Sequence, residues 1–168
     1  MPKIIENLEA RLVAEARKQI EESGYGAVTI RSVAKACGVG VGTVYNYFPS
    51  KDALLASYML ADWQECLAVI RRAETAAQSA QPVVRCIYGQ LLDFAQRHRT
   101  VFQDEAAASS FAGAFSRYHS VLRAQLAQPL VRFCGSSFAP EFIAEALLTW
   151  TMAGREFDEI YGMIEKLF

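Results

Sequence analysis

Apolar residues recur every three to four positions along most of the chain, which is the spacing of one face of an α-helix. Near the N-terminus this face holds Leu8, Leu12, Ala16 and Ile20, and charged residues fill the opposite face. The stretch stops at Gly24, because glycine tolerates the positive φ of a helix end. No segment shows the sustained two-residue alternation of a strand. The pattern therefore predicts an all-α fold.

Capping residues and helix breakers divide the remaining chain. Thr29 and Ser50 are good N-caps, and Pro82 and Pro140 suit the first turn of a helix. We expect Pro129 to kink or break a long helix. Together with the periodicity, these signals predict helices over residues 30–37, 41–47, 51–75, 82–98, 100–108, 113–133, 140–153 and 155–167.

The composition suits a folded domain. The chain has 168 residues, of which 52% are hydrophobic and 21% are charged, so it can bury a core and is not disordered as a whole. The formal net charge is −1, so any surface for a polyanion must be local. The four cysteines are scattered and only two histidines are present, which argues against zinc and favours reduced thiols. With no apolar run of membrane length and no secretory signal, we expect a cytoplasmic protein without a membrane partner.

Residues 29–55 carry the most informative pattern. Two short helices joined by three residues, with Gly38 at the bend, are typical of a helix-turn-helix. Val33 and Cys37 lie one turn apart on the first helix, and Val44 and Phe48 lie one turn apart on the second. These spacings give the two helices a shared apolar face.

The other face of the second helix is unusual for a solvated surface. Its residues are neutral, and several are hydrogen-bonding or aromatic: Val41, Gly42, Thr43, Tyr45, Asn46 and Tyr47. Residues 23–51 include no acid and three basic residues, Arg31, Lys35 and Lys51. Such a zone suits a phosphate backbone, and Lys51 could bind a phosphate together with free N–H groups at a helix start. The alternative is that Lys51 is an ordinary surface lysine.

The stretch resembles the DNA-binding domain of the TetR/AcrR family of transcriptional regulators, whose pattern is roughly T-x-x-x-I-A-x-x-A-G-V-S-x-G-T-[LIV]-Y-x-[HY]-F-x-[SN]-K-[ED]-x-L. At the positions of this pattern the chain has Thr29, Val33, Ala34, Cys37, Gly38, Val39, Gly42, Thr43, Val44, Tyr45, Tyr47, Phe48, Ser50, Lys51, Asp52 and Leu54, and Cys37 replaces the usual alanine. The match covers about a sixth of the chain. Gly40 stands where serine is usual, which removes a capping hydroxyl, and Tyr47 stands where histidine is commoner.

The resemblance implies DNA contacts of two kinds. Val41 and Asn46, together with Tyr45, would face base edges in the major groove, and Val41 offers only an apolar contact, for example with a thymine methyl. Gly42 would let the backbone approach the DNA. Phosphate contacts are implied for Thr29, Thr43, Tyr45, Tyr47 and Lys51, with Arg31 as a further basic candidate.

The resemblance also implies a helix-turn-helix domain of three helices over residues 1–50 and a helical ligand-binding and dimerisation domain over residues 51–168. The second domain carries no motif of its own and is rich in aromatic residues. A pocket for a hydrophobic or aromatic effector is implied among its middle helices. The candidate lining residues are Tyr58, Asp62, Trp63, Phe94, His98, Phe111, Phe115, Tyr118, His119 and Trp150. For each of them, ordinary core packing is the alternative.

The family dimerises through its last two long helices, which here would cover residues 139–153 and 155–167. The candidate interface residues lie on two apolar stripes and are Phe142, Ala146, Leu147, Trp150, Ile160, Tyr161 and Ile164. Packing within the chain is the alternative for each.

These inferences favour a homodimeric repressor that a small hydrophobic or aromatic effector releases from a palindromic operator in double-stranded DNA. No catalytic residue, metal or cofactor is expected. One alternative is a DNA-binding architectural or protein-interacting factor without an effector. Another is a small all-α enzyme, for which Asp104 and Glu105 are poor candidates, because neighbours on a helix point about 100° apart. No nucleophile elbow, P-loop or GxGxxG motif is present in the sequence.

Overall fold

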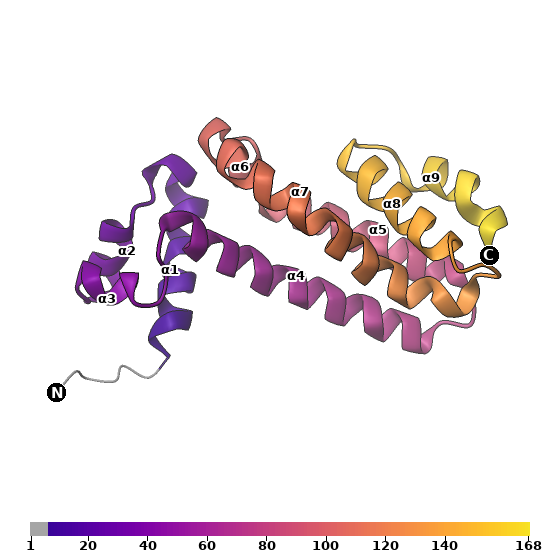
Figure 1. The fold of residues 1–168 in the computed structure, drawn as a ribbon, viewed down its shortest axis with the longest axis horizontal. Helices are drawn as coiled ribbons and strands as arrows, with labels where there is room; N and C mark the ends of the chain where they lie inside the picture. The colour runs from indigo at the N-terminus through magenta and orange to yellow at the C-terminus, as the bar shows by residue number, and fades with distance from the viewer. Residues whose placement is uncertain (1–6) are drawn as a thin grey trace. The chain divides into compact units, whose positions relative to one another are not determined.

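The computed structural model describes residues 7–168, except for the side chains of residues 106 and 108–117. The described part of the chain is helical and has no strand (Figure 1), which confirms the predicted all-α fold. Short 3₁₀ turns lie at Tyr25–Ala27, Gln128–Phe133 and Glu165–Leu167. The α-helices are α1 (Leu8–Ser23), α2 (Ile30–Cys37), α3 (Val41–Tyr45), α4 (Lys51–Ala76), α5 (Ala80–Arg97), α6 (Arg99–Phe102), α7 (Glu105–Ala127), α8 (Ala139–Met152) and α9 (Phe157–Ile164).

Most helices lie where the sequence predicts them, but the prediction around residues 100–133 is wrong in its boundaries. The stretch 100–108 is not one helix, because α6 ends at Phe102 and α7 begins at Glu105. The new start has a local cause, since the Asp104 carboxylate accepts the backbone N–H of Ala107 at 3.0 Å and so caps α7. The chain then stays helical through residue 113 and changes to a 3₁₀ turn beside Pro129, where the break was expected.

The chain packs as two compact units. Unit 1 comprises residues up to 61 together with 98–112, and unit 2 comprises residues 62–97 and 113–168. The division predicted from the sequence falls at the start of α4, whereas the packing units change within that helix.

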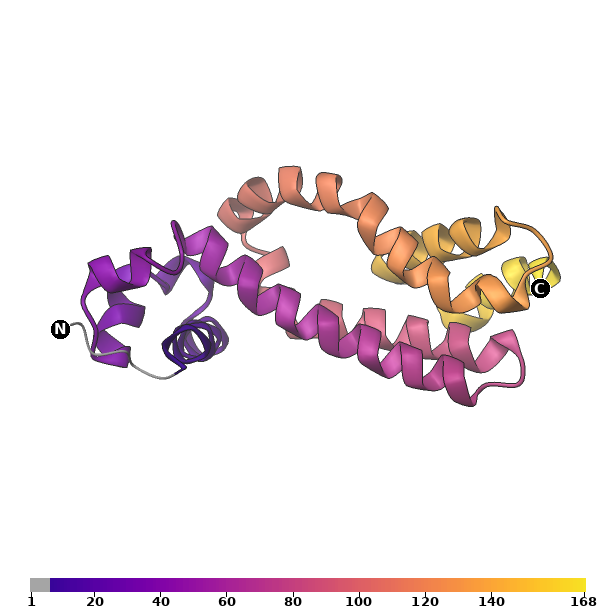
Figure 2. The same cartoon turned by 60° about the horizontal axis from the view of Figure 1, so that its bottom comes forward.

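Unit 1 is built around the buried face of α1. α1, α2 and α3 pack together in both views (Figures 1 and 2). The first turns of α4 close the same core, which also takes in Val101 of α6. The buried residues of this core are Leu8, Leu12, Ala16, Ile20, Tyr25, Val28, Ile30, Val33, Ala34, Val44, Phe48, Leu54, Leu55, Tyr58, Val101 and Ala107.

The ends of α2 follow the local signals in the sequence. Thr29 Oγ1 accepts the Ser32 backbone N–H at 2.9 Å, and the Ser32 hydroxyl oxygen accepts the Thr29 N–H at 3.0 Å. This reciprocal pair is a capping box, and it confirms Thr29 as the N-cap. At the other end, Gly38 takes φ +69°, the left-handed conformation that glycine adopts without strain.

Alanine in place of Gly38 is expected to destabilise unit 1 by about 1 kcal/mol, because the left-handed conformation costs a residue with a Cβ about 1–2 kcal/mol. No atom lies within 4 Å of the position a Cβ would take there, so the cost is conformational and not a clash. Gly42→Ala is the matched control. It places alanine in the helical α3, again with no atom within 4 Å, and should stabilise by about 0.5–1 kcal/mol. Urea unfolding curves that shift in the same direction for both variants would contradict this account.

Unit 2 is a helical layer in which α5 packs on α8 and α9. Its largest fully buried side chains come from the second part of α4, from α5, from the end of α7 and the 3₁₀ turn after it, and from α8 and α9: Ile70, Ile87, Leu91, Leu126, Leu130, Ile143, Leu147 and Ile164. The core is therefore mainly aliphatic, with Trp63 and Phe157 as buried aromatic members.

α4 is the one helix in the described residues whose length and composition would suit a membrane span, with a mean hydropathy of 1.2 over 18 residues. Its apolar side chains are shared between the two cores: Leu54 and Leu55 pack in unit 1, and Cys66 and Ile70 pack in unit 2. These contacts are those of a core helix.

Candidate nucleic-acid interface

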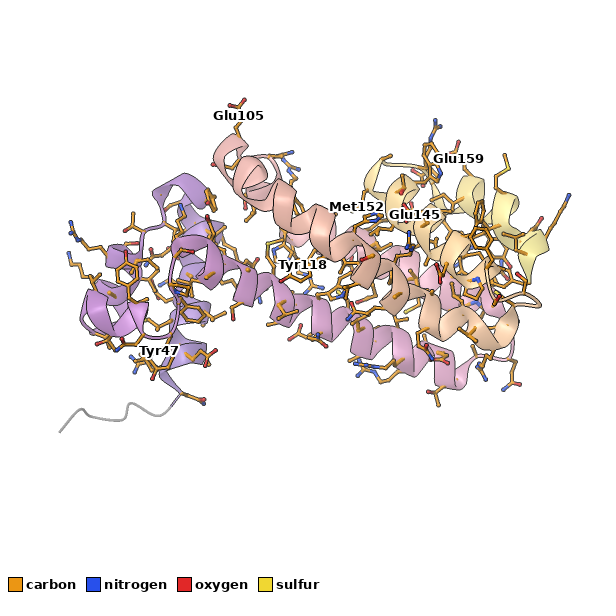
Figure 3. The ribbon with its side chains drawn as sticks, in the orientation of Figure 1. Tyr47, Glu105, Tyr118, Glu145, Met152 and Glu159 are labelled. Atoms are coloured by element: carbon orange, nitrogen blue, oxygen red, sulfur yellow. The ribbon has the colours of Figure 1, made fainter. Side chains whose placement is uncertain are left out.

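α3 presents two chemically different faces. Val44 of α3 and Phe48, which lies four residues later and beyond the helix, are buried in the core of unit 1. Tyr45, the last residue of α3, is 52% exposed, and the two residues that follow the helix are exposed too, Asn46 and Tyr47, the latter to 45%. Figure 3 labels Tyr47 just beyond the end of α3. The structure therefore places the neutral, hydrogen-bonding residues on the solvent face, as a surface that meets another molecule requires.

The remaining candidates for DNA contact lie in the same unit. Gly42, Thr29 and Arg31 are exposed, and Val41 and Thr43 are half-buried. Gly40 supplies no side-chain cap to α3, as expected for glycine in place of serine. All the predicted DNA-contacting residues thus belong to unit 1, and their contacts with DNA stay predictions.

The start of α4 holds the predicted phosphate anchor. The Ser50 hydroxyl oxygen accepts the Ala53 backbone N–H at 3.1 Å, which confirms Ser50 as a cap. The ammonium of Lys51 donates to the backbone carbonyl of Tyr25 and lies 3.7 Å from the centre of the Tyr25 ring. The Tyr25 hydroxyl donates to Asp52 Oδ1 at 2.6 Å.

Tyr25 is a member of this site that the sequence did not reveal. It lies 26 residues before Lys51, in the 3₁₀ turn after α1, and no periodicity links positions so far apart. Partial burial lowers the pKa of the Lys51 ammonium, against the opposing effect of the Asp52 and Asp104 carboxylates. Lys51 is therefore a half-buried cation with fixed neighbours and not a freely moving surface lysine.

The predicted effector-binding residues fall into separate groups. In unit 1, Tyr58 and His98 are buried with their ring centres 4.7 Å apart. In unit 2, Trp63 packs edge-on against Phe94 at 5.5 Å and donates its indole N–H to Gln125 Oε1 at 2.8 Å. These residues combine apolar surface with hydrogen-bonding groups.

Asp62 adds a charge to the group in unit 2. It is 3% exposed, and Arg97 Nη1 lies 3.8 Å from its Oδ2 and 3.9 Å from Glu65 Oε2. A buried carboxylate needs such a counter-charge, because removing an unpaired charge from water is costly.

Two of the predicted effector-binding residues lie on the surface. Tyr118, labelled in Figure 3, is 60% exposed and Trp150 is 49% exposed, so neither side chain lines an enclosed cavity in this structure. His119 is half-buried, with Nε2 at 3.6 Å from Glu145 Oε1. Phe111 and Phe115 lie among the side chains outside the structural description.

The predicted dimer-interface residues also divide. Leu147, Ile160 and Ile164 are buried in the core of unit 2, so they are core residues and their side chains are not available to a partner. This corrects their assignment to the interface, and the cause is that the apolar stripes of α8 and α9 face inward. Phe142 and Trp150 are exposed, and Ala146 and Tyr161 are half-buried.

Neither a metal site nor a reactive thiol stands out in the described part of the chain. No three His, Cys, Asp or Glu side chains there gather closely enough to hold a metal ion. All four cysteines are free thiols, and burial raises the pKa of each of them: Cys37, Cys66, Cys86 and Cys134. A raised pKa keeps a thiol in its unreactive protonated form.

Comparison with known sequences identifies relatives of the N-terminal region. Residues 12–58 match the family described as bacterial regulatory proteins, tetR family. The chain is 33% identical over 61 residues to the HTH-type transcriptional regulator UidR of Escherichia coli K12, a match that covers 36% of this chain and 31% of UidR. It is 34% identical over 93 residues to the HTH-type transcriptional repressor KstR of Mycolicibacterium smegmatis, covering 55% of this chain and 46% of KstR. The matches span less than half the length of these two relatives.

Solved structures resemble the chain over nearly its whole length. A transcriptional regulator of Streptomyces coelicolor A3(2) superposes with a TM-score of 0.71 at 15% identity, covering 96% of this chain and 98% of that one. FadR of Thermus thermophilus, a TetR-family transcriptional repressor solved in complex with lauroyl-CoA, superposes with a TM-score of 0.65 at 20% identity, covering 95% and 92%. At these identities the likeness shows the fold alone.

Proposed function

We propose that the chain, whose residues 12–58 match the tetR family of bacterial regulatory proteins, is a DNA-binding transcriptional regulator and acts as a homodimeric repressor that a small apolar or aromatic effector releases from a palindromic operator. The observation that carries the DNA-binding part is the two-faced α3. Its apolar side, with Val44, is buried, while Tyr45 at its end and Asn46 and Tyr47 directly after it are exposed. A helix of this kind fits the major groove, where hydrogen-bonding and apolar side chains read base edges.

Local charge supports the same proposal. The chain as a whole carries a net charge of −1, but residues 23–51 lack any acid. Arg31 and Lys51 come before and after α3 in the sequence, and no residue between them carries a carboxylate that would repel phosphates. Phosphate contacts of this kind set the position of the protein on DNA, and base contacts set its sequence preference.

Small-molecule control is supported by the mixed chemistry of the buried residues. Tyr58 and His98 in unit 1, and Trp63 and Asp62 in unit 2, combine rings with polar groups, as binding sites for small molecules do. α4 supplies side chains to both cores. We expect an effector to bind the DNA-free state more tightly by several kcal/mol, because only a differential affinity can shift the population of states.

Dimerisation is assigned to the exposed strip of α8. Phe142, Ala146 and Trp150 follow one another at four-residue intervals, so they share one face of the helix. Two of them are large exposed apolar side chains, and the small Ala146 between them allows a partner helix to approach closely. An isologous contact of two such strips would pair the recognition helices for a palindrome.

Titration of the wild-type protein with duplex DNA tests the DNA-binding part. We expect affinity to fall steeply between 50 mM and 200 mM salt, since each phosphate contact contributes a slope of about −0.9 in log K against log salt. An affinity that does not change with salt, or no binding at all, would contradict the proposal.

Asn46→Ala is expected to change sequence preference more than non-specific affinity. A bidentate contact of asparagine with adenine is worth about 1–3 kcal/mol of discrimination, and Asn46 is exposed at the end of α3. Selection of duplexes from a randomised pool with wild type and variant would measure the effect. The preferred sequence should lose definition at one position in each half-site, while binding to random DNA changes little. An unchanged preference would remove Asn46 from base readout.

A further inference from the structure

The start of α4 places Lys51 and Asp52, opposite charges, at adjacent positions. An unrestrained carboxylate beside a lysine competes with DNA phosphate for the ammonium. For Lys51 to bind a phosphate well, the Asp52 carboxylate has to be held elsewhere. The structure shows what holds it.

Tyr25 contacts both Lys51 and Asp52, each through a different part of the residue. Its hydroxyl donates to Asp52 Oδ1 at 2.6 Å, a short bond to a charged acceptor. Its backbone carbonyl accepts from the Lys51 ammonium, which lies 3.7 Å from the ring centre. Tyr25 is itself 6% exposed and packed in the core of unit 1, so the ring is a fixed support.

The second carboxylate near Lys51 also has its own bonding partner. Asp104 Oδ1 accepts the N–H of Ala107 at the start of α7, and Asp104 Oδ2 lies 3.9 Å from where a Cβ of Gly26 would be. Asp52 and Asp104 are the carboxylates whose charge acts on Lys51. Each is thus tied to a hydrogen-bond donor other than the ammonium.

The ammonium keeps capacity for a further ligand. It has three N–H donors, and the Tyr25 carbonyl takes one of them. The contact with the ring face is electrostatic and leaves the remaining N–H groups available. The side chain is therefore held at one place, with donors to spare for a phosphate oxygen.

We propose that Tyr25 is a positioning residue for DNA binding: its hydroxyl holds the Asp52 carboxylate away from Lys51, and its ring and carbonyl fix the ammonium where it meets a phosphate. The proposal rests on the proposed function, because it concerns the same DNA contact. According to this proposal, a buried tyrosine outside α2 and α3 affects the affinity for every DNA sequence.

Tyr25→Phe tests the hydroxyl alone, because it keeps the ring and the carbonyl. We expect affinity for preferred and random duplexes to fall by the same factor, about threefold to tenfold, and the salt slope to become shallower, towards that of Lys51→Ala. Asp52→Asn in the Tyr25→Phe background should restore the affinity, since the competing charge is gone. In the Lys51→Ala background, Tyr25→Phe should have no further effect on DNA binding.

A merely structural role of Tyr25 would give a different pattern, since loss of stability would weaken binding in the Lys51→Ala background too. Additive effects of the two substitutions would overturn the proposal, and so would a Tyr25→Phe variant that binds DNA as the wild type does. Should Tyr25→Phe fail to fold, Asp52→Asn alone decides: affinity equal to or above that of the wild type supports the proposal, and lower affinity overturns it. Absence of salt-dependent binding by the wild type would instead be a failure of the proposed function.

Discussion

Lys51→Ala is expected to weaken binding to all DNA sequences by a similar factor, more than about a hundredfold for a dimer. A hydrogen bond between charged groups is worth about 1.5–3 kcal/mol, and a symmetric dimer loses two of them. Lys51 is half-buried against Tyr25, so little side-chain freedom remains to be lost when it binds a phosphate. The slope of log K against log salt should become shallower by about 1.8, which is 0.9 for each lost contact. Fluorescence anisotropy titrations at several salt concentrations measure both quantities.

Lys166→Ala is the matched control for this prediction. Lys166 is an exposed lysine in the 3₁₀ turn after α9, in unit 2, and its removal changes the net charge by the same amount. We expect an unchanged salt slope. Equal losses for Lys51→Ala and Lys166→Ala would mean that net charge alone decides affinity, and the assignment of Lys51 as an anchor would be lost. A change of sequence preference in Lys51→Ala would likewise contradict a phosphate role.

Trp150→Glu is expected to abolish dimerisation and, with it, tight operator binding. In a two-fold symmetric contact the substitution places two carboxylates at the interface, and leaving a buried charge unpaired costs about 3–5 kcal/mol. The dimer dissociation constant should rise by more than about a hundredfold. Analytical ultracentrifugation over a range of protein concentrations measures it. The variant should still fold, because Trp150 is half exposed and lies outside the core of unit 2.

Leu60→Glu is the control that separates a loss of the α8 contact from a general effect of placing a carboxylate on the surface. Leu60 is 57% exposed on α4 and belongs to unit 1, so it offers the same change of an exposed apolar side chain to a charged one. We expect it to leave association unchanged. A Trp150→Glu variant that sediments as the wild type does would refute the assignment of the α8 strip, and a dimer lost only with Leu60→Glu would move the interface to another surface.

Prediction from the sequence succeeds best where the local structure depends on residues that are close together along the chain. Thr29 and Ser50 cap helices as their residue types suggest, and Gly38 adopts the left-handed turn. The burial of Val44 follows from its spacing to Phe48. All these signals act within about one helical turn, which is the range over which a capping hydroxyl or an apolar pair operates.

Pairings between distant segments are where prediction from the sequence ends. Helical spacing shows that Leu147, Ile160 and Ile164 lie on apolar stripes. A stripe that packs in the core of its own chain and a stripe that packs against a partner subunit have the same sequence pattern, so the spacing does not distinguish them. The structure settles this because α5 packs against both α8 and α9 and covers the stripes. The contact of Tyr25 with Lys51 and Asp52 has the same character, since it depends on how the turn after α1 meets the start of α4.

The sharing of α4 between two cores has a consequence for dissecting the protein. A fragment that stopped at residue 50 would lack Leu54, Leu55 and Tyr58, all fully or almost fully buried in unit 1, and would leave the apolar faces of α1 and α3 open to water. Truncation at that point should give an aggregation-prone peptide and not an autonomous headpiece. A piece that retains this packing must include Tyr58 and also Val101 and Ala107, so unit 1 cannot be excised as one continuous N-terminal segment.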